Sequence, residues 1–267
     1  EPDFLIMKMM KLNKIFILAI VALGLASCGK DFLNKEPFDK LVPNSYFNTE
    51  ADLALYTNSF YQDFIPSGLA IVQADEMGDY TSKNNSPTFI AGNFSSVDQK
   101  MWNWTKLRNV NYFLGKYDNP NIPEEARNHY AGVARFFRAL FYYAMVKDFG
   151  DVPWYSKAMD TNDPDLYKAR DPRTAVMDSV LADLNFAVAN IREPKDNTAS
   201  TITKWVALGL KSRVCLFEGS FRKNHKQLGL SESADKWLEQ AADAAKQVMD
   251  AKKYSLYSTG KPALDYR

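Results

Sequence analysis

The sequence predicts a mainly α-helical fold. Beyond the first few dozen residues, apolar side chains recur every three or four positions in one segment after another. Almost no stretch alternates apolar and polar residues as a half-buried strand does, and polar loops with glycine and proline separate the segments. Small residues stand where successive helices would cross. We therefore expect helix-turn-helix pairs of the tetratricopeptide type, with an irregular helical bundle as the alternative.

Aromatic residues mark the first two helices. Thr49 and Asp52 have the spacing of a capping box, so the first helix is expected to begin there and to stop before Pro66. Its apolar face contains Leu53, Tyr56, Phe60 and Phe64. The second helix is expected to carry Trp104, Leu107, Val110, Leu114 and Tyr117.

The next helix has the strongest pattern. Pro123 suits a first-turn position, the acidic Glu124 and Glu125 favour the positive end of the helix dipole, and Gly150 can close the helix. Additional aromatic residues widen its apolar surface, which predicts packing on more than one side. Two arginines on this apolar surface, Arg135 and Arg138, are expected to pair with acids or carbonyl groups.

Three further helices complete the pattern. Asp171 and Pro172 are interpreted as the N-cap and first-turn proline of one helix, and Thr203 as the cap of the next, which is expected to end at Gly219. The last helix is predicted over residues 233–252. Cys215 lies in an apolar helical stretch and is interpreted as a buried thiol. Trp102, Trp104, Trp205 and Trp237 are expected within helices, as core residues.

The N-terminal region has the form of an export signal. A basic patch precedes an uncharged apolar run over residues 15–26, which is too short for a stable membrane-spanning helix. The run ends in Leu-Ala-Ser-Cys, which resembles a bacterial lipobox, so Cys28 is the expected lipidation site. We divide the chain into a non-native or over-extended start (1–9), a lipoprotein signal peptide (10–27) and a helical region (28–267).

Composition excludes several classes of function. The 33 basic and 32 acidic residues are balanced, without the basic stripe that nucleic-acid binding requires. His129 and His225 have no cysteine or carboxylate at ligand spacing, so no metal site is predicted, and no cofactor motif is present. The sequence shows no phosphate loop or nucleophile elbow, and most acids lie on predicted solvated faces. A binding protein is therefore expected rather than an enzyme.

Several segments together resemble the SusD/RagB family of outer-membrane nutrient-binding lipoproteins of Bacteroidetes. The most specific match is ARFFRALFYY at 134–143 followed by FGDVP at 149–153. The other similar segments are CGKDFLNKEP at 28–37, YFNTEADL at 46–53, RNVNYFL at 108–114, ADLNFA at 182–187, TKWVA at 203–207 and AADAAKQV at 241–248.

The resemblance implies a SusD-like fold with tetratricopeptide-like helix pairs. It also implies a surface-exposed, lipid-anchored outer-membrane protein that binds glycans and delivers them to a SusC-like TonB-dependent transporter. Family members continue well past position 267, so the chain is expected to stop before their loop-rich C-terminal half. Two alternatives stay open: a RagB-like protein that captures peptides, and a tetratricopeptide-like scaffold that binds only proteins.

Two segments are the candidate ligand contacts. The polar loop over residues 75–93 combines hydrogen-bonding side chains with an aromatic ring, as sugar recognition requires. The candidates in it are Asp79, Tyr80, Asn84 and Asn85. The second segment is Trp154-Tyr155, which follows Val152-Pro153 in a loop. A merely solvated loop or a transporter contact is the alternative for the 75–93 segment.

Overall fold

The computed structural model describes residues 46–68, 92, 102–193, 200–261 and 265. One compact unit begins at Phe47. The leader, Cys28, and the candidate residues Asp79, Tyr80, Asn84 and Asn85 lie outside the described residues.

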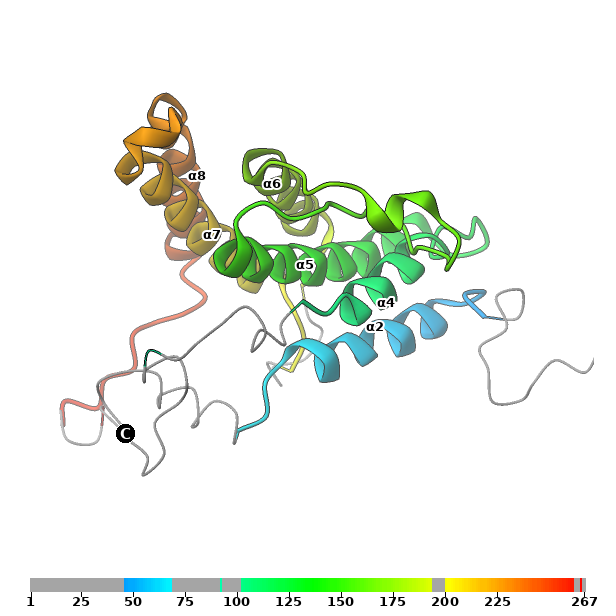
Figure 1. The fold of residues 1–267 in the computed structure, drawn as a ribbon. Helices are drawn as coiled ribbons and strands as arrows, with labels where there is room; N and C mark the ends of the chain where they lie inside the picture. Colours follow the sequence, from blue (N-terminus) through cyan, green and yellow to red (C-terminus); the bar gives the residue numbers. More distant parts are fainter. Residues whose placement is uncertain (1–45, 69–91, 93–101, 194–199, 262–264, 266–267) are drawn as a thin grey trace, which may run out of the picture. The chain divides into compact units, whose positions relative to one another are not determined.

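The described residues form a mainly helical structure without strands, which confirms the predicted fold class (Figure 1). An isolated antiparallel bridge joins Val152 to Asp171. The helices are α2 (Glu50–Phe64), α4 (Thr105–Leu114), α5 (Glu124–Phe149), α6 (Arg173–Asn190), α7 (Lys204–Asn224) and α8 (Ala234–Asp250). Short 3-10 helices are η4 (Pro164–Tyr167), η5 (Lys226–Leu228) and η6 (Ser231–Ser233).

Helix α5 is the centre of this unit. It packs against α2 and α4 and against α6, and in Figure 1 α6 lies on the opposite side of α5 from α2 and α4. Consecutive helices also pack on each other, α5 with α6 and α7 with α8 most closely. The rings of Phe113, Phe60 and Phe137 form an edge-to-face chain from α4 through α2 to α5, with centroids 6.0 and 5.8 Å apart. The predicted packing of α5 on more than one side is confirmed.

The predicted helix ends are partly confirmed. Thr49 and Asp52 form the capping box of α2, and the Thr203 hydroxyl accepts a hydrogen bond from the Val206 N–H at the start of α7. Gly150 follows α5 with a φ of 70°, a conformation that favours glycine. The prediction for Pro123 was displaced by one position, because it is the N-cap of α5 and the first helical residue is Glu124.

The prediction that α7 ends at Gly219 was wrong, because the helix continues to Asn224. Gly219 is buried where α8 crosses α7. A β-carbon at this position would lie 2.8 Å from Leu238 Cγ and 3.1 Å from the Ala234 carbonyl oxygen. Gly219 therefore allows α7 and α8 to pack closely together, and it does not end α7.

Buried charges join the helices in pairs. Arg138 of α5 donates from Nε and Nη2 to the two carboxylate oxygens of Asp183 on α6, at 2.6 and 2.8 Å. Arg135 lies 3.9 Å from the same carboxylate and stacks over Phe186, 4.0 Å from the ring centroid. The acid partners predicted for both arginines are confirmed. Cys215 is buried as predicted, and burial raises the pKa of its thiol to about 11.

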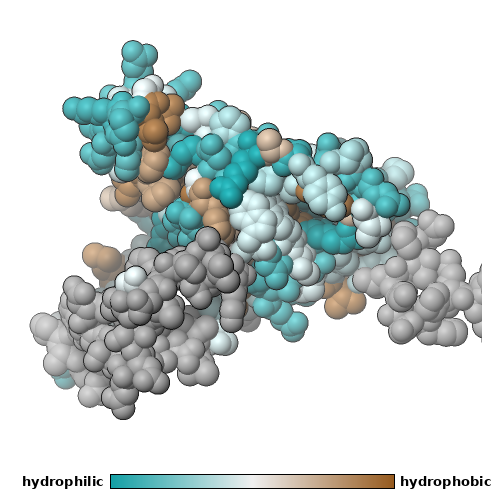
Figure 2. All heavy atoms as spheres, viewed as in Figure 1, coloured by the Kyte–Doolittle hydropathy of each residue, from teal (hydrophilic) through white to brown (hydrophobic). Residues whose placement is uncertain are grey.

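Within the described ranges, no helix is both long enough and apolar enough to cross a membrane. Figure 2 shows that the face in view is mostly hydrophilic, with apolar areas that are small and separate, one of them over α7 and α8. Small, scattered apolar areas are usual on protein surfaces.

Candidate ligand-binding cavity

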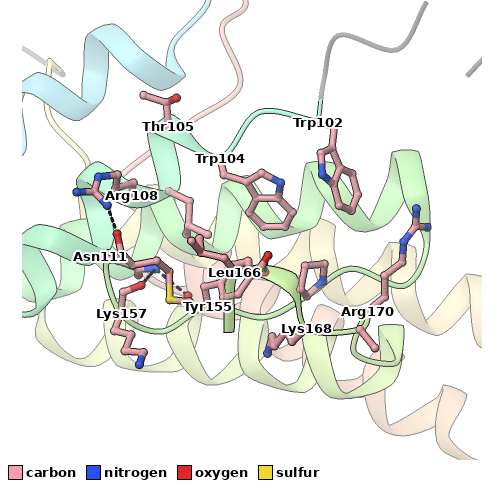
Figure 3. A pocket seen from close by; sticks show the side chains of 14 residues that line it. Trp102, Trp104, Thr105, Arg108, Asn111, Tyr155, Lys157, Leu166, Lys168 and Arg170 are labelled. Carbon is pink, nitrogen blue, oxygen red and sulfur yellow. Dashed lines mark hydrogen bonds between the residues drawn. The ribbon is translucent and has the colours of Figure 1, made fainter. Parts of the chain in front are cut away.

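A cavity of about 570 Å³ lies beside the N-terminal half of α4 (Figure 3). One wall comes from residues 102–111, and the other from the loop between α5 and α6, over residues 153–170. Its lining residues are Trp102, Trp104, Thr105, Leu107, Arg108, Asn111, Pro153, Tyr155, Lys157, Met159, Leu166, Lys168, Ala169 and Arg170.

The loop that forms the second wall is fixed at both ends. Its two arms meet at the bridge, where the Asp171 N–H donates to the Val152 carbonyl at 3.2 Å. The Asp171 carboxylate accepts from the Trp154 N–H at 2.7 Å and from Lys168 Nζ at 2.8 Å. Burial opposes its ionisation, but these two bonds together lower its pKa.

Asp171 therefore does not cap α6 as predicted. The helix begins at Arg173, with Pro172 at its N-cap. The carboxylate of Asp171 instead bonds the opposite arm of the loop, at Trp154. Asp151, from the other arm, accepts the hydrogen bond from the Arg173 N–H at 2.8 Å. Each aspartate thus accepts a hydrogen bond from the opposite end of the loop, and the two bonds hold the ends of the loop together.

Asn111 of α4 attaches the loop to the helix. Its buried amide donates to the carbonyl oxygens of Tyr155 at 2.8 Å and Lys157 at 3.3 Å, and its own carbonyl accepts from Arg138 at 3.3 Å. Arg108, on the preceding turn of the same helix, donates from its guanidinium to the Met159 carbonyl. These bonds set the separation of the two walls and so the width of the cavity.

Three aromatic side chains line the cavity. The Trp104 ring lies edge-to-face with Tyr155 at 5.4 Å and with Trp102 at 5.2 Å between centroids. Trp102 is 41% exposed. The prediction that both tryptophans lie within a helix was wrong, because α4 begins at Thr105. Trp237 of α8 is buried, as expected of a core residue.

Trp154 and Tyr155 have different surroundings. The Trp154 ring packs on Tyr142, 4.2 Å between centroids, and the Arg138 guanidinium lies 5.2 Å from it, so this side chain contacts α5. The Tyr155 ring lines the cavity instead, as successive residues of an extended segment point to opposite sides. The Tyr155 N–H donates to the Tyr142 hydroxyl at 2.6 Å, and burial raises the pKa of that hydroxyl.

Among the described residues that line the cavity, every charged side chain is a cation. Arg108, Lys157, Lys168 and Arg170 contribute to the lining, and none of the lining residues is an aspartate or glutamate. Figure 3 shows Arg108 and Lys157 toward one end of the cavity and Arg170 toward the other. Among the described residues, no cluster of histidine, cysteine and carboxylate side chains could hold a metal ion.

A second, smaller hollow of about 370 Å³ lies between α2, α5 and the segment after α6. Its charges are paired, since Arg192 Nη2 is 2.5 Å from Glu50. His129 accepts a hydrogen bond from the Arg192 N–H at 3.1 Å. Burial, with the nearby Arg192 charge, lowers the pKa of His129 to about 4, while Glu50 opposes this shift.

Comparison with known proteins assigns the chain to a family. A SusD-like family model, described as starch-binding and associating with the outer membrane, matches residues 45–206. The chain belongs to the SusD-like family. A SusD-like protein of Bacteroides ovatus is 24% identical over 225 residues, which cover 79% of this chain and 40% of that protein. SusD-like protein P25 of Formosa agariphila is 22% identical over 237 residues, with 80% and 44% covered. The chain thus spans less than half the length of these SusD-like relatives.

Solved structures agree on the fold. A SusD-like protein from Bacteroides fragilis superposes with a TM-score of 0.64 at 22% identity, over 83% of this chain and 42% of that one. A structure solved with a xylogluco-oligosaccharide superposes with a TM-score of 0.51 at 24% identity, over 66% and 35%. At these identities the likeness establishes the SusD-like fold alone.

Proposed function

We propose that this SusD-like protein captures oligosaccharides in the cavity beside α4 and delivers them, without cleaving them, to a SusC-like TonB-dependent transporter. It does so as a lipoprotein held at the surface of the outer membrane through Cys28. Membership of a family described as starch-binding and associating with the outer membrane supports this proposal. So does the oligosaccharide in one structural neighbour.

The aromatic lining of the cavity carries the proposal. Sugar rings have apolar C–H faces that pack on aromatic side chains, while their hydroxyls need donors and acceptors around the rim. Trp102, Trp104 and Tyr155 supply the rings. Thr105 and the cationic side chains supply hydrogen-bonding groups. The volume of about 570 Å³ is within the usual range of small-molecule sites.

Capture without catalysis agrees with the lining. Glycoside hydrolysis of the common type needs two carboxyl groups flanking the scissile bond, about 5 to 10 Å apart. The part of the lining that the structure describes includes no carboxylate. A bound sugar would therefore meet cations and aromatic rings there, which hold it but do not protonate its glycosidic oxygen.

The remaining candidate residues are assigned either to the ligand or to the loop that lines the cavity. Asp79, Tyr80, Asn84 and Asn85, in the 75–93 loop, are proposed to add hydrogen bonds and a second stacking surface. Trp154 contacts Tyr142 and Arg138, so we assign it to supporting the loop rather than to the ligand.

Membrane attachment through Cys28 has its own test. A single acyl chain holds a protein only marginally, so stable anchoring needs more than one chain on the lipidated cysteine. Expression with labelled palmitate in a Bacteroidetes host should label the wild type and leave Cys28→Ser unlabelled. Label that persists in the variant would exclude Cys28 as the attachment site.

Calorimetry of the full-length protein against oligosaccharides and peptides tests the proposed function. Trp102→Ala should weaken oligosaccharide binding by about 1 to 3 kcal/mol, the scale of a stacked aromatic contact. Trp205→Ala removes a tryptophan of α7 that does not line the cavity and is the matched control, with unchanged affinity expected.

The same experiment contains the results that would overturn the proposal. Peptide binding without oligosaccharide binding would favour peptide capture, and no binding of either would favour a scaffold for proteins. Equal oligosaccharide affinity in the wild type and Trp102→Ala would move the sugar site elsewhere. Chromatography of the ligand after incubation should show it intact, and shorter products would establish an enzyme.

A further inference from the structure

We infer that the cavity beside α4 selects anionic oligosaccharides, whose sugar units carry a carboxylate or a sulfate group. The inference rests on the proposed function, because it names the ligand class of the same cavity. It is carried by two cavity arginines, Arg108 and Arg170, that face no acidic partner among the described residues.

The two lysines of the cavity are already neutralised. Lys157 Nζ lies 3.1 Å from Asp163 and 3.7 Å from Asp165, and these carboxylates belong to the loop itself. Lys168 Nζ lies 2.8 Å from Asp171 and donates to the Trp154 carbonyl at 2.7 Å. Both lysines therefore stabilise the loop and offer little charge to a ligand.

The two arginines differ from the lysines in this respect. Within the described part of the chain, no carboxylate lies within ion-pair distance of Arg108 or Arg170. Arg108 donates to a neutral carbonyl, that of Met159. The Arg170 guanidinium lies over the Trp102 ring, 5.1 Å from its centroid. A guanidinium that lies over a ring can still direct N–H groups away from the ring, in the fork that matches carboxylate and sulfate oxygens.

Charge and aromatic surface occur together in this cavity. Figure 3 shows Trp102 and Trp104 between Arg108 at one end and Arg170 at the other. An oligosaccharide whose rings pack on these tryptophans can thus place acidic groups next to both arginines. A neutral sugar would shield the arginines from water without supplying a counter-charge, which disfavours its binding. An anionic sugar supplies the counter-charge and forms charge-assisted hydrogen bonds.

Matched ligands test the inference on the full-length protein. Calorimetry compares oligogalacturonate with its fully methyl-esterified, neutral form, and a sulfated galactan oligosaccharide with its desulfated form. At least one anionic ligand should bind about tenfold more tightly than its neutral partner. This preference should shrink when salt rises from 50 to 500 mM, because partly exposed charges are screened. The ligand pair in which the anionic form binds more tightly shows whether the cavity recognises a carboxylate or a sulfate group.

Substitutions of the cavity arginines test which residues cause the tighter binding of anionic ligands. Arg108→Gln and Arg170→Gln should each lower the affinity for the anionic ligand about tenfold and the affinity for the neutral ligand by less, so that the ratio of the two affinities falls. Arg170→Lys, which keeps the charge but not the fork, should lie between wild type and Arg170→Gln. Arg213→Gln removes the same charge from an exposed position of α7 outside the cavity and should have no effect.

The outcomes separate the inference from the proposed function. Equal binding of anionic and neutral forms, with sensitivity to Trp102→Ala, would overturn the anionic preference and leave sugar capture intact. Failure of every oligosaccharide to bind would overturn both. An oligoglutamate peptide is included as a competitor, and its binding in place of the sugars would also overturn both.

Discussion

The helix interfaces and the cavity use arginine in opposite ways. Between α6 and α7, the fully buried Glu218 accepts from Arg173 at 2.5 Å and from Arg222 at 2.8 Å. Beside α4, Arg108 and Arg170 lie in a cavity whose described lining residues include no carboxylate. The first group of arginines forms buried ion pairs within the protein, and the second keeps its charge for solvent or a ligand.

This difference separates residues that hold the fold from residues available for binding. Breaking a buried pair leaves an uncompensated charge in a low-dielectric interior, which is strongly unfavourable. Removing an exposed arginine without an acidic partner removes little from the folded state. Substitutions that break the buried ion pairs should therefore lower the free energy of unfolding far more than substitutions of the cavity arginines.

The largest effect is expected at the buried pair. Glu218→Ala leaves both Arg173 and Arg222 without their carboxylate, and we expect the free energy of unfolding to fall by about 3 to 5 kcal/mol. Urea unfolding followed by circular dichroism measures the change. A loss below 1 kcal/mol would contradict the role assigned to this carboxylate.

Helix α7 offers two glycines in contrasting surroundings. Gly219→Ala places a methyl group 2.8 Å from Leu238 Cγ, and we expect a loss of about 2 kcal/mol. Gly209→Ala is the matched control, because it lies on an exposed face of the same helix with no atom within 4 Å. Alanine there should raise stability by about 0.5 to 1 kcal/mol through helix propensity. Similar changes at both positions would contradict the close packing of α7 on α8.

His129, in the hollow between α2 and α5, should make the stability of the protein depend on pH. Its pKa is lowered to about 4 in the folded protein, whereas the unfolded chain has a value near 6.5. Between these values the unfolded state binds the extra proton, so stability must fall as the pH drops. We expect about 1 kcal/mol of loss between pH 7 and pH 4.5, allowing for partial solvent access to the ring.

A variant isolates this contribution from the carboxylates that titrate in the same range. His129→Gln removes the ionisable ring, so the loss of stability between pH 7 and pH 4.5 should be smaller in the variant by the amount due to His129. Melting curves of both proteins at the two pH values supply the comparison. Parallel losses would show that burial does not lower the pKa of His129.

The smallest effect on stability is expected in the cavity itself. Arg170→Gln removes a cation that contacts the Trp102 ring but no acid among the described residues, so stability should change by less than about 1 kcal/mol. Arg138→Gln, which breaks the pair with Asp183, should cost several times more. Equal losses for the two substitutions would contradict the division of the arginines.

Local signals predicted the helices well. The capping box at Thr49, the Thr203 cap and the buried face of α5 depend on residues within a few positions of one another, so spacing alone identifies them. Errors arose where tertiary contacts override local preference. Asp171 bonds across a loop rather than capping α6, and Gly219 admits Leu238 rather than ending α7.

The cavity was only partly predictable. Tyr155 was a candidate from the sequence, but Trp102 and Trp104 were assigned to the core, because tryptophans at helical spacing usually are. Trp104 and Tyr155 are 51 positions apart and meet because Asn111 fixes the loop to α4. Two tryptophans separated by one residue, immediately before a helix, were the available signal. This sequence signal could not indicate that the loop between α5 and α6 would leave a cavity between itself and the two tryptophans.

A structure of the full-length protein with the oligosaccharide that binds most tightly tests the central claim most directly. We predict a sugar ring packed against Trp102 or Trp104, with an acidic group of the ligand within hydrogen-bond distance of Arg108 or Arg170. A ligand bound elsewhere, with this cavity empty or filled by the protein's own side chains, would contradict the account.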